Sequence, residues 1–502
     1  MTLADFQAAP WKKSHAAYDG AIFAVGRSPE FATAEVLLAS TYRSAGFASH
    51  RESEVPAAGR AFDKASAKRP RQSSGRIGVE TWRTVLHGTL QSPKLKQQSA
   101  KRFLQLSPVV PDTALYSGSA RLAGQPWNPG QLVAGIIGIG AADHPQALQL
   151  WSDLFDGLSV TDSDDVWARW LQAEFEARRT VKCDWQLAPL AESCHFTTEE
   201  RSALAYPAEQ FNRDLRAVLQ AKGLMTRRQW VSILESVLRL GAVAHILWVC
   251  ESHARLWSLM KEVLGGAEAP EPVECVQRIF SGLGRPLVYG APALPMMREM
   301  ASHYLHARLG INLVLWQLED AGVPTRSLKT GRAVAELLRT VAARRRTLAD
   351  AGTMDRFGEL CDQYPRELSC KKGVGNNMIE FWRHALGQRQ TADETLRGYD
   401  QGYQLRKKAE YASAPWIVSL GPVALLAFTH CCLLEAASPR SVSRLCEHLG
   451  RYGVDIDRDD IAEGEVGMQL RMLGLVLDSP DAESGMLLVP PFEIAADGQR
   501  AS

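Results

Sequence analysis

The sequence predicts a mainly α-helical protein, on three observations. Apolar residues recur at helical spacing over long stretches, as in Trp230, Leu234 and Val237, and again in Ala333 to Leu348. Proline and glycine punctuate these stretches at intervals that give helices of ordinary length joined by short loops. Apolar residues make up 46% of the 502 residues, enough for packed cores in about three structural units.

Composition excludes several classes of protein. The apolar content of 46%, with 57 Lys and Arg residues nearly balancing 56 Asp and Glu residues, argues against wholesale disorder, and the overall composition is not that of a collagen-like repeat. The nine cysteines match no paired zinc-binding spacing, so we expect free thiols in a reducing compartment. The stretch Met1 to Lys13 lacks the apolar core of a secretory signal, and a cytoplasmic location is therefore predicted.

The chain divides into five predicted regions. Residues 1–53 are expected to form a small α/β region, and residues 54–76, rich in Ala, Gly, Ser, Lys and Arg, a basic linker or arm. Residues 77–410 form the helical body, residues 411–495 a distinct C-terminal module, and residues 496–502 a tail. Within the module, residues 412–434 carry no charged side chain and are long enough to span a membrane. Gly421 and Pro422 interrupt this stretch, so we expect a buried helix and no membrane contact.

The C-terminal module has a specific predicted order of elements. Helices are expected over Val423–Ala436, over Arg440–Leu449 after a Ser438-Pro439 cap, and over Arg458–Leu473 ending at Gly474. Strands at 475–477 and 486–489 then flank a polar turn. Three helices followed by a β-hairpin resemble the winged-helix superfamily, a variant of the helix-turn-helix.

The resemblance implies one of two uses for the module. Winged helices usually place their third helix in the DNA major groove, but many serve only as protein contacts. Between Ser438 and Phe492 there are five arginines and ten acidic residues, and the predicted turn of the hairpin carries no lysine or arginine. Because affinity for a duplex depends on neutralising phosphates, the acidic module opposes DNA contact through the usual face and predicts either a contact with a protein partner or packing against another part of the chain.

The opposite charge balance lies near the N-terminus. From Ala58 to Gln105 there are eleven basic residues against Asp63 and Glu80. We expect this arm to bind a nucleic acid, DNA in the first instance, with Trp82 and Phe103 stacking on bases. The competing interpretation is a solvated linker followed by the end of an amphipathic helix. The predicted nucleic-acid-binding residues are Arg60, Lys64, Lys68, Arg69, Arg71, Arg76, Lys94, Lys96, Lys101 and Arg102.

One set of residues invites a metal interpretation. Glu299, His303 and His306 are offset by four and three residues, which places them on one helical face. Two imidazoles and a carboxylate are ligands for zinc or iron. The neighbouring methionines instead favour a helix packed in the core, with only the polar ends of these three side chains outside it. No nucleotide-binding, hydrolase or kinase signature occurs, so no catalytic residue and no cofactor is predicted.

These patterns lead to a functional hypothesis and one alternative. The hypothesis is a non-enzymatic accessory or scaffold subunit, associated with nucleic acid through the basic arm and with a protein through the acidic module. A helical chain that ends in a winged helix is similar to accessory proteins of multiprotein prokaryotic DNA-transaction and phage-defence (antiviral) systems. The alternative is a metal-dependent enzyme of an unrecognised family that uses Glu299, His303 and His306.

Overall fold

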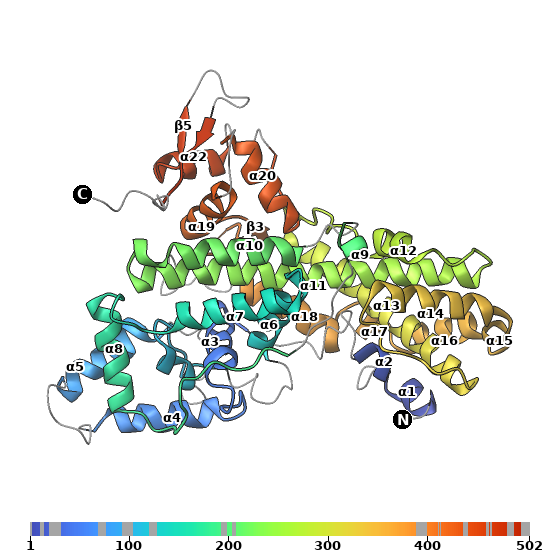
Figure 1. Ribbon diagram of the computed structural model, residues 1–502, viewed down its shortest axis with the longest axis horizontal. Helices are drawn as coiled ribbons and strands as arrows, with labels where there is room; N and C mark the ends of the chain where they lie inside the picture. Colours follow the sequence, from blue (N-terminus) through green and yellow to red (C-terminus); the bar gives the residue numbers. More distant parts are fainter. Residues whose placement is uncertain are drawn as a thin grey trace.

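Two long helices form the spine of the protein. Helix α11 (Arg227–Leu264) packs along α13 (Ala293–Asp320), and both lie in the centre of the molecule (Figure 1). Helix α11 begins at a capping box. The Thr226 side chain accepts a hydrogen bond from the backbone amide of Gln229, and the Gln229 side chain accepts one from the backbone amide of Thr226. Its 38 residues span about 57 Å at 1.5 Å per residue, so one helix contacts elements from α3 and α6 to α18 and α19.

The structure is a computed structural model, and it describes residues 3–10, 15–19, 32–68, 77–92, 104–119, 128–191, 198–202, 207–387, 399–409, 411, 413–434, 440–457, 461, 464–478 and 486–492. The prediction of a mainly helical protein is confirmed. The helices before the spine are α1 (Leu3–Ala8), α2 (Ala16–Asp19), α3 (Ala34–Gly46), α4 (Val55–Ser66), α5 (Val79–Thr84), the π-helical turn η1 (Val85–Leu90), the 3₁₀ turn η2 (Pro111–Leu115), α6 (Pro129–Gly140), α7 (His144–Leu158), α8 (Val166–Ala177), α9 (Thr198–Ser202), α10 (Pro207–Gln220) and η4 (Lys222–Leu224).

The elements that surround and follow α13 complete the body. They are α12 (Pro272–Ile279), β1 (Leu287–Val288), α14 (Gly331–Ala343), α15 (Arg345–Asp350), α16 (Thr353–Gln363), α17 (Pro365–Leu368), α18 (Gly373–Gly387), β2 (Leu405–Lys407) and β3 (Trp416–Val418). Strands β2 and β3 form an antiparallel pair that brings the chain back to the spine before the C-terminal module begins.

The C-terminal elements follow the predicted order in part. A two-residue strand separates the second helix from the third, and the third helix, predicted from Arg458 (outside the described residues), is described from Glu465. The elements are α19 (Pro422–Leu433), α20 (Val442–Arg451), β4 (Val454–Asp455), α22 (Glu465–Met472), β5 (Val476–Asp478) and β6 (Met486–Leu488). Strands β5 and β6 pair antiparallel, and Gly474 adopts a φ of +69° where the chain turns from α22 toward β5. The predicted cap at Ser438 and Pro439 lies outside the described residues, and Ser441 occupies the cap position of α20.

This module shares its core with the body. A single apolar core runs from α3, α6 and α10 through α11 and α13 to α19, α20 and β6. Strand β4 also pairs in parallel with β1 of the body, through Leu287 opposite Val454 and Val288 opposite Asp455. The boundary predicted at residue 411 therefore does not separate two independently packed domains.

A second apolar core is built from residues in the first part of the chain, between Phe47 and Cys183. It joins α4, α5, η2 and α8, and we call these elements the N-terminal lobe. Phe62 of α4 stacks against Tyr116 at 4.0 Å and against Phe175 of α8 at 5.1 Å, measured between ring centroids. The structure thus places a packed helix over residues 55–66, where the sequence predicts a linker.

Membrane-like composition occurs in helices that the fold buries. Helix α19 covers only twelve residues of the uncharged stretch, and nine of these twelve are buried, as the sequence predicts. Among the described residues, α11 alone is long and apolar enough to cross a membrane, yet 94% of its most apolar window is buried inside the protein. That pattern is typical of the core helix of a soluble protein.

Candidate functional site

One face of α4 carries three of the predicted nucleic-acid-binding residues. Arg60 and Lys64 are exposed one helical turn apart, and Lys68 is exposed two residues after the helix ends. We call these three residues the α4 basic face. The helix faces outward on this side because Val55, Phe62 and Ser66 are buried on the other.

Acidic side chains also lie near this face, since Glu54 is exposed at the N-cap of α4 and Glu80 is exposed on α5. Asp63 of α4 lies 3.0 Å from the Nε2 atom of His87, measured from its Oδ1 atom, so its carboxylate is directed toward η1. Arg83 adds a further exposed cation on α5, which contacts α4. The other seven predicted residues, Arg69, Arg71, Arg76, Lys94, Lys96, Lys101 and Arg102, lie outside the described residues, as does Phe103.

The aromatic part of the prediction needs correction. Trp82 is fully buried in the core of the N-terminal lobe, with the Arg178 guanidinium 4.7 Å from its ring centroid, so it is not available for stacking on a base. A different pair is at least partly accessible on the same lobe. Trp167 and Trp170 of α8 are half-buried and stack on each other at 4.9 Å. Trp167 and Trp170 are three residues apart, and this spacing in the sequence already predicts that they are neighbours on one face of a helix.

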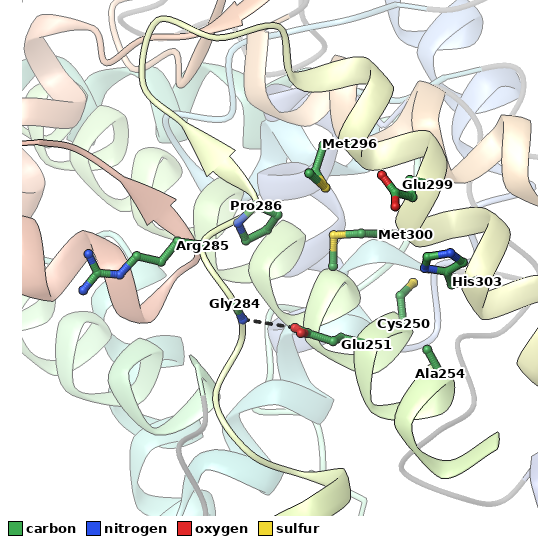
Figure 2. A pocket seen from close by; sticks show the side chains of 10 residues that line it. All are labelled: Cys250, Glu251, Ala254, Gly284, Arg285, Pro286, Met296, Glu299, Met300 and His303. Carbon is green, nitrogen blue, oxygen red and sulfur yellow. Dashed lines mark hydrogen bonds between the residues drawn. The ribbon is translucent and has the colours of Figure 1, made fainter. Parts of the chain in front are cut away.

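The predicted metal ligands do not converge. Glu299 and His303 both line a pocket of about 290 Å³ between α11 and α13, while His306 lies off this pocket and its Nδ1 atom is 2.8 Å from the carbonyl oxygen of Ser302 (Figure 2). Among the residues that the structure describes, no group of three or more His, Cys, Asp and Glu side chains is arranged to hold a metal ion. The three-residue metal site is therefore wrong, because adjacency on a helix does not make side chains converge on a point.

The pocket itself combines an apolar wall with two carboxylates. Met296, Met300 and Pro286 form the wall, and Arg285 extends away from it to donate a hydrogen bond to Asp455 (Figure 2). On α11, Glu251 accepts hydrogen bonds from the backbone amide of Gly284 at 3.1 Å and from Arg255 at 2.7 Å. This carboxylate thus anchors the loop between α12 and β1 to the spine.

The deeper groups beneath the pocket are held neutral. Burial raises the pKa of the Cys250 thiol well above its ordinary value, so the sulfur is protonated and a poor nucleophile. On the next turn of α11, burial lowers the pKa of His253 to about 3. The pocket therefore has room for a small ligand, and Cys250, which lines it, is not an activated thiolate.

A buried polar network joins the C-terminal module to the body. The Asp214 carboxylate on α10 accepts hydrogen bonds from His448 Nε2 at 2.8 Å, from Tyr452 Oη at 2.7 Å and from Gln210 Nε2 at 2.7 Å. Arg451 in turn donates to Gln210 Oε1 at 2.7 Å. Because Gln210, Asp214, His448 and Tyr452 are all buried, with Arg451 exposed at the edge, this network fixes α20 on α10 in one orientation.

Comparison with known proteins gives no further guide. No protein-family model, no curated protein and no solved structure matches the chain.

Proposed function

We propose that the protein is a non-enzymatic, nucleic-acid-associated accessory or scaffold subunit. It binds a nucleic-acid backbone through the α4 basic face and a protein partner through the C-terminal module. The observation that carries the proposal is the exposure of Arg60 and Lys64 one turn apart on α4, whose opposite face is packed, with Lys68 exposed just beyond the end of the helix. Cations arranged in a row suit a polyanion, because each phosphate contact releases a counterion.

The dimensions of the face suit several phosphates. Arg60 and Lys64 are four residues apart on α4, which corresponds to about 6 Å at the rise of an α-helix, and Lys68 follows the end of the helix. A duplex carries one charge per roughly 1.7 Å of its axis, so several phosphates lie within reach of these three side chains. The stacked pair Trp167 and Trp170 on the same lobe adds a surface for unpaired bases if a single strand is bound.

The C-terminal module is assigned to a protein and not to DNA. The order of α19, α20, α22, β5 and β6 resembles a winged helix, with α22 at the place of the groove-binding helix. The single arginine of α22, Arg471, donates to Asp478 of β5, and Met468 and Met472 are the most exposed side chains of that helix. A helix of this kind has little to offer a phosphate backbone or a base edge.

The setting of this function follows from the resemblance. Helical chains ending in a winged helix resemble accessory proteins of prokaryotic DNA-transaction and phage-defence assemblies, in which a separate subunit supplies the motor or nuclease. A basic face at one side and an acidic module at another allow one subunit to hold a nucleic acid and a protein at the same time. The Glu299, His303 and His306 enzyme alternative is not carried forward, since its three residues do not meet.

The test is a titration of the full chain against a fluorescent 30-base-pair DNA duplex, followed by anisotropy between 50 and 300 mM salt. The triple variant Arg60→Ala, Lys64→Ala, Lys68→Ala is expected to bind at least tenfold more weakly at the lowest salt. It should also lose about 3 from the slope of log affinity against log salt. A single-stranded DNA and an RNA of the same sequence distinguish the kinds of nucleic acid.

Two matched variants decide the outcome. Arg471→Ala removes the cation at the end of α22 and is expected to leave duplex binding unchanged. Arg344→Ala with Arg346→Ala removes two exposed cations at the far end of the body, and is likewise expected to be neutral. Loss of binding in Arg471→Ala or in the Arg344 and Arg346 variant, with the α4 variant unaffected, would show that the nucleic-acid face is misassigned.

A further inference from the structure

The pocket beside the spine reaches from solvent to the core. Helix α11, helix α13 and the loop between α12 and β1 form its three walls around about 290 Å³ (Figure 2). Of the residues that line it, Cys250 is fully buried and Met300 is 9% exposed, whereas Glu299 and His303 are exposed. A small molecule can therefore enter from solvent and be enclosed on three sides, as in most ligand sites.

The two carboxylates of this pocket differ in their partners. Glu251 already accepts hydrogen bonds from Arg255 and from the backbone amide of Gly284, so its charge is offset. Within the part of the chain that the structure describes, the Glu299 side chain takes part in no hydrogen bond and no ion pair. Glu299 is therefore the acceptor that a cationic ligand can reach without displacing a partner.

The positive charge at the pocket is directed elsewhere. Arg285 lies 3.1 Å from Asp455 of β4, measured between its Nη1 atom and the Oδ1 atom, and Figure 2 shows it extending away from the cavity. No lysine and no other arginine belongs to the lining. An anion in the pocket would meet the Glu299 carboxylate with no guanidinium aimed at it, so the charges favour a cation.

The apolar wall indicates the rest of the ligand. Met296 and Met300 lie one turn apart on α13, and Pro286 lines the cavity from the loop. Methionine sulfur makes favourable contacts with aromatic rings. Since a cavity of about 150 Å³ holds one benzene, this pocket suits roughly ten non-hydrogen atoms, which is one ring with a short chain.

We propose that this pocket binds a small aromatic amine, with the ammonium group on the Glu299 carboxylate and the ring against Met296, Met300 and Pro286. The proposal goes beyond the function proposed above, because it assigns a small-molecule ligand to the body of the protein. The loop that carries Pro286 continues into β1, which pairs with β4. A ligand seated against this loop therefore also stabilises the place where the C-terminal module joins the body.

The probe is 3-phenylpropylamine, which has ten non-hydrogen atoms and is a cation at neutral pH. Titration of the full chain, followed by saturation-transfer NMR of the probe, is expected to show one site per chain with a dissociation constant of about 1 mM or lower. Binding should also slow amide hydrogen exchange in peptides that cover residues 284–288. The matched probes 3-phenylpropanol and 3-phenylpropionate, which lack the positive charge, should bind at least tenfold more weakly.

Three variants locate the probe. Glu299→Gln keeps the shape of the side chain and removes its charge, and is expected to weaken amine binding at least tenfold. Ala254→Phe fills the cavity from α11 and is expected to abolish binding. Asp320→Asn removes an exposed carboxylate at the end of the same helix as Glu299, outside the pocket, and should leave binding unchanged.

The other outcomes decide against the proposal. Absence of saturable binding by the wild-type chain overturns the site, and unchanged affinity in both Glu299→Gln and Ala254→Phe places the amine elsewhere. Equal binding of 3-phenylpropanol overturns the charge argument. Equal binding of 3-cyclohexylpropylamine, which has the same carbon skeleton without an aromatic ring, overturns the aromatic preference.

The same measurements separate this inference from the proposed function. The α4 triple variant is expected to keep full amine affinity, and Glu299→Gln is expected to keep full duplex affinity. If the wild-type chain binds the amine through Glu299 and binds no nucleic acid, the nucleic-acid half of the function fails and the pocket stands. If it binds the duplex through α4 and no amine, the pocket fails alone.

Discussion

Helices α4 and α22 are two peripheral helices with opposite surfaces. Both pack one side on a core and expose the other, but α4 exposes Arg60 and Lys64 while α22 exposes Met468 and Met472. They lie on different sides of α10 and α11 in Figure 1. The exposed side of a helix carries no packing requirement, so its composition indicates the ligand more directly than the fold does. We propose the first helix as a surface for a nucleic-acid backbone and the second as part of a surface for a protein partner.

The two regions also differ in how they are held. The N-terminal lobe has a core of its own around Phe62, whereas the C-terminal module shares the main core and is locked to α10 through Asp214. The lobe is therefore expected to unfold as a unit. The C-terminal module should unfold only when the hydrogen bonds to Asp214 are lost or when the whole body unfolds.

The largest expected effect is in the core of the lobe. Phe62→Ala removes a ring stacked on Tyr116 and Phe175, and should lower the free energy of unfolding of the lobe by about 4 kcal/mol. Denaturant unfolding followed by tryptophan fluorescence is expected to show a separate early transition, with duplex binding lost and amine binding kept. Leu148→Ala, at a 42% exposed position on α7, is the control. A single unshifted transition in Phe62→Ala would contradict the separate core.

The next effect is at the joint of the C-terminal module. Asp214→Ala leaves His448 and Tyr452 buried without their acceptor and should cost about 3 kcal/mol of stability. Asp455→Ala, which breaks the exposed pair with Arg285, should cost less than about 1 kcal/mol. Limited proteolysis is expected to cut near the start of α20 in the Asp214 variant only. Equal stability of the two variants would contradict a module fixed through Asp214.

A smaller effect concerns acid pH and belongs to the spine that separates the two regions. Burial lowers the pKa of His245 to about 4 and that of His253 to about 3. As pH falls below 6.5, the unfolded chain takes up protons on these histidines before the folded chain does, so stability is full above pH 6.5 and is lost on acidification. Each histidine should contribute about 2 kcal/mol of loss between pH 7.5 and 5.

The variant His245→Phe isolates one of these contributions. Its stability should fall less than that of the wild type between pH 7.5 and 5, measured by denaturant titration at each pH, because one of the two buried imidazoles is gone. His303→Ala, at an exposed position on α13, should follow the wild type. A pH dependence that is the same in His245→Phe and in the wild type would show that this histidine is not buried as a neutral group.

The smallest expected effect is at the pocket between α11 and α13. Because Glu299 and His303 line it without a third converging ligand, protein dialysed against zinc should retain no stoichiometric metal, and His303→Ala should leave its metal content unchanged. Duplex binding should also be unchanged in His303→Ala. A stoichiometric metal that is lost in His303→Ala would contradict this prediction and would show a metal site in the body of the protein.

The sequence predicted the elements whose signals are local. The helical spacing of Trp230 to Met260 anticipates α11, and Gly474 with the flanking apolar runs anticipates the end of α22 and the β5 and β6 pair. The turn at Gly474 needs a positive φ, which explains why a glycine there was informative.

Other features depend on residues far apart in the chain. Helix α4 contains a single large ring, Phe62, and the Phe175 that covers it lies 113 residues later, so an Ala, Gly and Lys composition resembled a linker. Trp82 is buried for the same reason, against Phe62 and Phe175. The exposure of Met468 and Met472 required knowing which face of α22 meets the core. Apolar pattern alone does not give that face in an eight-residue helix.

Hydrogen exchange of the full chain with a saturating DNA duplex tests the central claim most directly, since amide protection reports both helices at once. The account predicts slower exchange in peptides covering residues 55–68 and no change in those covering residues 465–478. Protection of residues 465–478, with residues 55–68 unaffected, would contradict it.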